Sequence, residues 1–237
     1  MKRLAVWALS VFAVFGAPLA AQSPRSAEGF DQKASESEAI AQFWSFAECT
    51  ARVNTADAQK LLNHIQWREA DNNRAAKFAL SKTKCLGPLL RPTALSFKPD
   101  LLHGALASYF LTRQYDDGNF PDFSATPYQF DAAYVDRFKE PKDRLRALQL
   151  SVSECTFRNA PAQVIAFLDS KPMSAEEGSA IGALMPYLSA CLQLGNDDKI
   201  TLSKTLLRSY LGQAGYAVNL AYSTGAKHSL LAAEPSG

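Results

Sequence analysis

The stretch Glu-Cys-Thr-Ala-Arg at residues 48–52 returns as Glu-Cys-Thr-Phe-Arg at residues 154–158, and 154 − 48 places the copies 106 positions apart. A second cysteine follows each copy at the same spacing, since 85 − 49 and 191 − 155 both equal 36. All four cysteines of the chain therefore belong to one repeated frame. The pattern indicates an internal duplication of two similar units.

Hydrophobic spacing predicts helices on both sides of each cysteine. In the first half we expect a helix from Ala39 to about Asn54, a second capped by Thr55, a third from Asp71 through Cys85 to a stop at residues 87–88, an extended piece at residues 93–97, and a fourth helix beginning at Pro99. In the second half we expect a helix ending near Asn159, one beginning at Pro161, one capped reciprocally by Ser174 and Glu177 and ending at Gly195, an extended piece at residues 200–203, and a last helix that matches the fourth.

The predicted fold is therefore all-α. It consists of two tandem four-helix repeats related by pseudo-twofold symmetry, each with one internal disulfide and a short extended segment before its last helix. The expected boundaries are a signal peptide at 1–21, a flexible leader at 22–37, repeat 1 at 38–115, an aromatic-rich connector at 116–141, repeat 2 at 142–222 and a loose tail at 223–237. Because the connector is so aromatic, we expect it to pack across both halves.

The first 21 residues have the layout of a secretory signal peptide: a basic start, an apolar run and small residues before a polar one. The apolar run is shorter than the roughly 20 residues that cross a bilayer, so no stable span is expected after cleavage, although an uncleaved anchor is the alternative. Removing Lys2 and Arg3 takes the net charge from +2 to 2 − 2 = 0. A neutral chain indicates no nucleic-acid partner, and export indicates a periplasmic or secreted protein.

In an oxidising compartment an even number of matched cysteines indicates disulfides. Four cysteines allow three pairings, and the duplication favours Cys49–Cys85 and Cys155–Cys191, because equivalent positions in like units bond alike. We interpret both bonds as structural. A redox pair is the alternative, which the lack of a Cys-x-x-Cys motif disfavours.

The two Glu-x-x-x-Arg pairs, Glu48 with Arg52 and Glu154 with Arg158, place opposite charges one helical turn apart. The simplest interpretation is an ion pair on a surface or interface, which stabilises little. If both pairs met across the pseudo-twofold axis, however, they would form a four-charge floor of a groove between the repeats.

Metal and cofactor chemistry is not indicated. His64, His103 and His228 are scattered without a partner at ligand spacing, and residues 116–119 with Asp122 lack the alternation and closing glutamate of a calcium loop, so we interpret them as a turn. Neither a nucleophile elbow nor a phosphate loop is present in the sequence. We therefore assign no catalytic residue, metal or cofactor.

The second half carries Glu154-Cys155-x-x-Arg158, Cys191-Leu192, Thr201-Leu202 and Leu207-Arg208, with Tyr210, Leu211 and Tyr216 beyond. These motifs resemble repeats in a family of small exported bacterial proteins, alphaproteobacterial in type. The first half matches at its Glu, Cys and Arg positions, but has His103 where the family pattern prefers the arginine represented by Arg208. The resemblance covers about 180 residues, supports a duplicated helical fold and implies no activity.

By exclusion, the sequence favours a binding or interaction module of the cell envelope, whose groove between repeats takes a protein or peptide partner or a small ligand. One alternative is an envelope enzyme with carboxylates as acid and base, using Glu48, Glu154, Arg52, Arg158 or Arg208. Another is a purely structural envelope component. The sequence does not indicate the oligomeric state.

Overall fold

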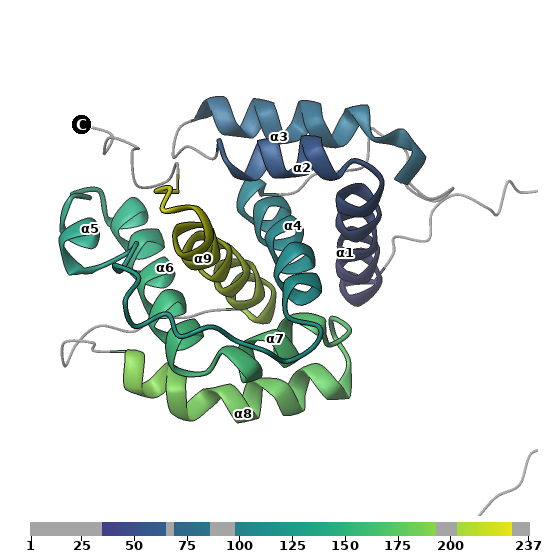
Figure 1. Ribbon diagram of the computed structural model, residues 1–237. Helices are drawn as coiled ribbons and strands as arrows, with labels where there is room; N and C mark the ends of the chain where they lie inside the picture. Colours follow the sequence, from purple (N-terminus) through teal and green to yellow (C-terminus); the bar gives the residue numbers. More distant parts are fainter. Residues whose placement is uncertain (1–34, 65–68, 86–97, 193–202, 229–237) are drawn as a thin grey trace, which may run out of the picture. The chain divides into compact units, whose positions relative to one another are not determined.

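A computed structural model describes residues 35–64, 69–85, 98–192 and 203–228 (Figure 1). All regular secondary structure within these ranges is helical, which confirms the predicted fold class. The predicted signal peptide, nearly all of the leader, the helix stops at residues 87–88 and 195, the extended pieces at residues 93–97 and 200–202 and the end of the tail lie outside the described residues.

The helices are α1 (Glu36–Val53), α2 (Thr55–Leu62), α3 (Glu69–Ser81), the 3-10 turn η1 (Thr83–Cys85), α4 (Pro99–Gln114), α5 (Ala132–Asp136), α6 (Pro141–Asn159), α7 (Pro161–Asp169), α8 (Ala175–Cys191) and α9 (Lys204–Thr224). Prolines occupy the first position of α4, α6 and α7, where a missing N–H has no helical partner to lose. The predicted starts at Pro99 and Pro161 are confirmed.

Several boundaries differ from the prediction because local capping decides them. The α1 helix starts at Glu36, earlier than expected, since Ser35 and Glu38 form a reciprocal capping box. Thr55 does not cap α2: it is the first helical residue, and its hydroxyl donates to the Ala51 carbonyl at 3.0 Å. The third helix ends at Ser81, so Cys85 lies in the 3-10 turn and not on a helix face.

The two helices α4 and α9 form the centre of the fold. They make the most extensive interhelical contact, with α1 packed against α4 and α6 packed against α9 (Figure 1). Every residue from 102 to 108 on α4 and from 207 to 218 on α9 is buried, so both helices are covered on all sides along these stretches. A helix buried all round cannot show the one-sided apolar pattern of a surface helix.

Glycine allows the α4 and α9 backbones to touch. A Cβ atom placed on Gly104 would lie 2.1 Å from Ser209 Oγ and 2.3 Å from Ser209 Cα. A Cβ atom on Gly212 would lie 2.5 Å from Ser108 Oγ and 2.7 Å from the Gly104 carbonyl oxygen. The two serines at the crossing are small, and their hydroxyl groups are hydrogen-bonded to the backbone. Ser108 donates to the Gly104 carbonyl at 2.7 Å, and Ser209 donates to the Asp100 carbonyl.

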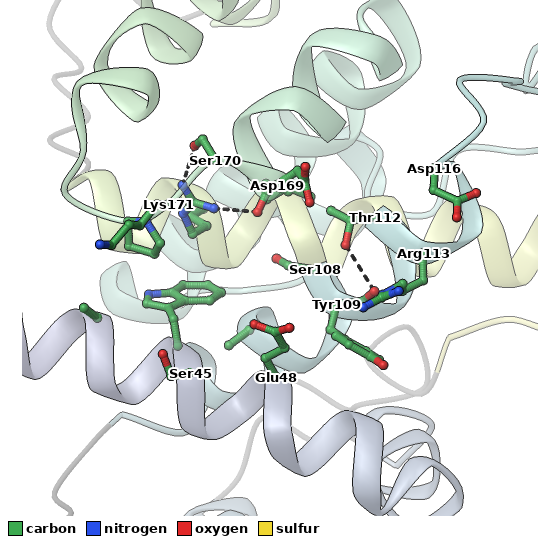
Figure 2. A pocket seen from close by; sticks show the side chains of 16 residues that line it. Ser45, Glu48, Ser108, Tyr109, Thr112, Arg113, Asp116, Asp169, Ser170 and Lys171 are labelled. Atoms are coloured by element: carbon green, nitrogen blue, oxygen red, sulfur yellow. Dashed lines mark hydrogen bonds between the residues drawn. The ribbon is translucent and has the colours of Figure 1, made fainter. Parts of the chain in front are cut away.

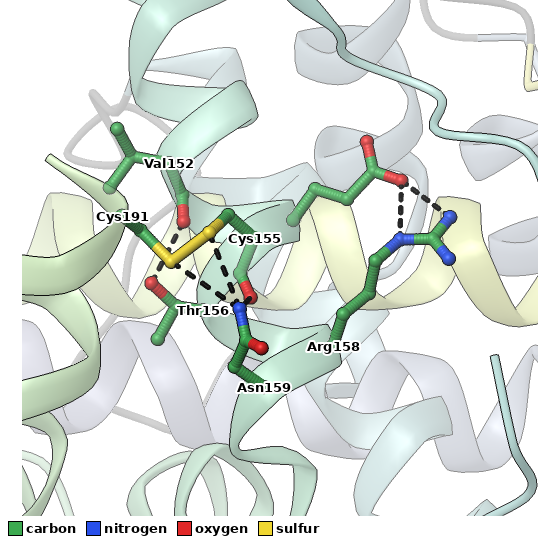
Figure 3. Close-up of a disulfide and its surroundings, with 7 residues drawn as sticks. Val152, Cys155, Thr156, Arg158, Asn159 and Cys191 are labelled. Carbon is green, nitrogen blue, oxygen red and sulfur yellow. Dashed lines mark hydrogen bonds and ion pairs between the residues drawn. A yellow bond between two sulfur atoms is a disulfide. The ribbon is translucent and has the colours of Figure 1, made fainter. Parts of the chain in front are cut away.

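The predicted disulfides Cys49–Cys85 and Cys155–Cys191 are both present, with Cα–Cα distances of 5.6 and 5.8 Å. The first joins α1 to η1, and the second joins α6 to α8 (Figure 3). Helix ends fall at the same offset, since α1 ends at Val53 and α6 at Asn159, and 159 − 53 = 106. The tandem symmetry of the two halves stays a prediction.

Substituting the glycine at the crossing tests the close approach of α4 and α9. We expect Gly104→Ala to lower the free energy of unfolding by about 3 kcal/mol, because the added methyl group meets the Ser209 backbone. Gly178→Ala in α8 is the matched control: its added Cβ meets open space, and we expect a gain of about 0.5 kcal/mol. Urea unfolding of both variants makes the comparison, and equal effects would contradict the close crossing.

Candidate functional site

A cavity of about 520 Å³ opens between α1, α4, α9 and the chain that follows α7 (Figure 2). The α1 helix contributes Ala41, Trp44, Ser45 and Glu48, whose spacing of three and four residues places them on one helix face. Figure 2 shows Ser45 and Glu48 projecting from α1 toward the Ser108 side of the cavity.

The other walls combine small, aromatic and charged side chains. The α4 helix contributes Ala105, Ser108, Tyr109, Thr112 and Arg113, again at three- and four-residue spacing, and Asp116 follows it. The last wall consists of Leu168, Asp169, Ser170, Lys171, Pro172 and Arg208. Both signs of charge therefore surround a space of a size typical of small-ligand sites.

Arg208 is buried at the inner wall and is held by polar contacts from three directions. Its guanidinium donates to the Leu168 carbonyl at 2.7 Å, to Ser170 Oγ at 2.9 Å and to Glu177 Oε1 at 2.9 and 3.2 Å. The rings of Trp44 and Phe167 lie 5.4 and 4.6 Å from it. Burial lowers the pKa of Arg208, and Glu177 opposes that shift. Through these contacts Arg208, which lies on α9, links this helix to α7 and α8.

The predicted capping box at the start of α8 forms only in part. Ser174 Oγ accepts the Glu177 amide at 3.2 Å, as expected. The Glu177 carboxylate, however, accepts the Met173 amide at 2.8 Å and the Arg208 guanidinium, and not the amide of Ser174. The Glu177 carboxylate, which the capping-box pattern assigned to the Ser174 amide, instead binds the buried Arg208.

Glu154 and Arg158 form a buried ion pair that holds the connector. Arg158 donates to Glu154 Oε1 through two nitrogens at 2.7 and 2.9 Å (Figure 3). The carboxylate also accepts the backbone amides of Gln129 at 2.9 Å and Phe130 at 2.6 Å. Complete burial raises the pKa of Glu154, and these donors oppose the shift. Glu154 thus anchors the connector near its middle, at residues 129 and 130.

Arg158 binds the preceding part of the connector, residues 123–127, by donating to backbone carbonyl groups of that segment. It donates to Phe123 O at 2.7 Å, Thr126 O at 2.9 Å and Pro127 O at 3.0 Å. Phe123 and Phe130 are buried, whereas Tyr128 is exposed and lies over Arg158. The short helix α5 was not predicted within this segment.

The equivalent pair in the first half has a different environment. Glu48 and Arg52 are both exposed, and no ion pair joins them in the part of the chain that the structure describes. Glu48 lines the cavity and Arg52 follows one turn later on α1. Of the predicted polar site, the cavity therefore brings together Glu48 and Arg208. Glu154 and Arg158 lie elsewhere, under the connector, so the four-charge floor does not form.

Of the three histidines, His103 and His228 belong to the core, His64 is exposed just after α2, and none of the three lines the cavity. His103 and His228 are buried, and burial lowers the pKa of His103 to about 3 and that of His228 to about 4. A hydrogen bond with the Leu62 backbone opposes the shift at His228, whose ring lies 6.3 Å from that of Tyr216. His228 is thus packed against the core, although the sequence assigned it to the loose tail. Among the described residues, no group of three or more His, Cys, Asp or Glu side chains could hold a metal ion.

Comparison of the chain with protein-family models, with curated proteins and with solved structures finds no match. Within the described ranges, none of the helices has the length and apolar character needed to cross a membrane.

Sequence reasoning missed Trp44 and Tyr109 as cavity residues. The available signal was their four-residue spacing, Trp44 from Glu48 and Tyr109 from Ala105, which places each pair on one helix face.

Paired substitutions test the two Glu-x-x-x-Arg environments. We expect Glu154→Gln to lower the free energy of unfolding by about 3 kcal/mol, since it leaves Arg158 without its buried counterion. Glu48→Gln, at an exposed position, should change it by less than about 0.5 kcal/mol. Urea denaturation measures both, and similar losses in the two variants would refute the distinction.

The buried His228 predicts a pH dependence of stability. Its pKa is lower in the folded chain than the ordinary 6.5, so the unfolded chain binds the proton more readily. The stabilisation is complete above pH 6.5 and is lost as the pH falls toward about 4, by about 3 kcal/mol in full. Compared with His228→Gln in urea unfolding between pH 7 and 4, the natural chain should show the steeper loss. Parallel curves would contradict the assignment.

Proposed function

We propose that the protein is an exported binding module of the cell envelope, built from two disulfide-linked four-helix repeats about a pseudo-twofold axis. The observation that carries the proposal is the cavity of about 520 Å³ at the junction of the two halves. Its walls come from α1 and α4 of the first half and from α7 and α9 of the second. A peptide or small polar ligand is the proposed occupant.

The crossing of α4 and α9 supports the proposed symmetry. Gly104 and Ser209 are equivalent in the sequence comparison, since residues 101–106 match residues 206–211, and they lie against each other at the crossing. A residue that contacts its own equivalent is expected on a twofold axis. The two disulfides with the same 36-residue separation support the same organisation.

Disulfides in both halves support an oxidising location, as a periplasmic or secreted protein would have. Removal of residues 1–21 and membership of the family of exported bacterial repeat proteins stay parts of the proposal. The enzyme alternative has fewer groups to use than the sequence suggested. Glu154 is completely buried, and Arg208 already contacts Glu177, Leu168 and Ser170.

Filling the cavity tests the proposed function. Thr112→Trp adds a large ring at the cavity wall, and Ala56→Trp adds the same ring at an exposed α2 position outside it. We expect members of a library of tripeptides, amino acids and sugars to raise the melting temperature of the natural chain and of Ala56→Trp with increasing concentration. Thr112→Trp should not respond. A library without effect, or an unchanged response of Thr112→Trp, would contradict the proposal.

A further inference from the structure

We infer that the Glu48/Arg52 face of α1 binds the main chain of an extended partner peptide, in the way that Glu154 and Arg158 bind the connector. The inference rests on the proposed function, because it uses the equivalence of the two halves and the cavity between them. It adds the class of ligand and the groups that recognise it.

The connector shows what a Glu-x-x-x-Arg pair recognises in this protein. Glu154 accepts two consecutive backbone amides, and Arg158 donates to three backbone carbonyls within residues 123–127. These five groups are all main-chain atoms, so the contacts do not depend on which side chains the bound segment carries. The pair is a receptor for polypeptide backbone.

Aromatic side chains complete the recognition in the second half. Tyr128 lies 4.4 Å from the Arg158 guanidinium, and the Phe123 ring lies 5.3 Å from that of Phe157. Phe123 also contacts Tyr222 near the end of α9. The bound segment therefore crosses the face of α6 close to the last turn of the central helix.

The first half presents the same pair without a bound segment in the described structure. Glu48 and Arg52 have the same spacing on α1 as Glu154 and Arg158 on α6, and both are exposed. The cavity at Glu48 reaches Arg113 and Asp116 at the end of α4, which corresponds to the end of α9 that the connector crosses. The cavity in the first half therefore lies at the position that corresponds to the connector-binding face in the second half.

Charge favours a peptide over a simple ion at this face. Glu48 offers hydrogen-bond acceptors and Arg52 offers donors, and a peptide backbone carries the matching donors and acceptors along one chain. The cavity is lined by the carboxylates of Glu48, Asp116 and Asp169 and by the cations Arg113 and Lys171, so a simple ion of either sign would meet like charges as well as opposite ones. Trp44 and Tyr109 offer aromatic surface at the same cavity for aromatic or proline side chains of the peptide.

The connector sequence itself is the probe. A synthetic peptide of residues 120–131, Phe-Pro-Asp-Phe-Ser-Ala-Thr-Pro-Tyr-Gln-Phe-Asp, is titrated into the full-length exported chain by calorimetry. We expect saturable binding that Glu48→Gln and Arg52→Gln each weaken about tenfold, as the loss of a charged hydrogen-bonding group predicts. Glu36→Gln, an exposed change on the same helix, should leave the affinity unchanged.

A second peptide separates backbone recognition from side-chain contacts. Methylating the amides that correspond to Gln129 and Phe130 keeps every side chain, and should weaken binding as much as Glu48→Gln does. The inference would be overturned if the peptide did not bind, or if Glu48→Gln and Arg52→Gln bound it with the same affinity as the natural chain. If the peptide fails while the library responds in a manner that Thr112→Trp blocks, only the inference falls. If neither binds, the proposed function falls as well.

Discussion

The close contact of Gly104 with Ser209 is the constraint on which the rest of the structure depends. It lets α9 lie against α4 with the backbones touching, and α9 is then covered on every side from residue 207 to residue 218. Burial of that stretch takes Arg208 out of water, so its guanidinium needs Glu177 and the Leu168 carbonyl as partners. These contacts set the end of α7 against α9 and thereby form the inner wall of the cavity.

The two Glu-x-x-x-Arg pairs show how one motif serves different purposes in different surroundings. On α6 the pair is enclosed by the connector, and its charges are satisfied by each other and by the backbone. On α1 the same spacing leaves Glu48 and Arg52 exposed beside a cavity. A buried pair that loses a partner is costly, whereas an exposed pair contributes little to stability. Stability therefore explains Glu154 and Arg158 but does not explain Glu48 and Arg52.

Features set by local chemistry or by the duplication could be predicted from the sequence. The proline starts at Pro99 and Pro161 and the pairing of the four cysteines are of this kind. Features set by distant partners could not: Glu177 lies 31 residues from Arg208, and Glu154 lies 25 from Gln129. The difference between Glu48 and Glu154 has the same origin. The connector buries Glu154, but nothing in the Glu-x-x-x-Arg motif of α6 indicates that a distant segment will cover it.

Mapping the probe peptide of residues 120–131 on the isotope-labelled chain by amide chemical shifts is the most direct test of the account. The central claim is that Glu48 and Arg52 are the open counterpart of a pair that is already filled. It predicts shift changes concentrated in residues 41–52, 105–116 and 168–172, with α6 and residues 123–130 of the chain unchanged. Changes confined to α6 and residues 123–130 would show that the peptide displaces the connector, and would contradict the claim.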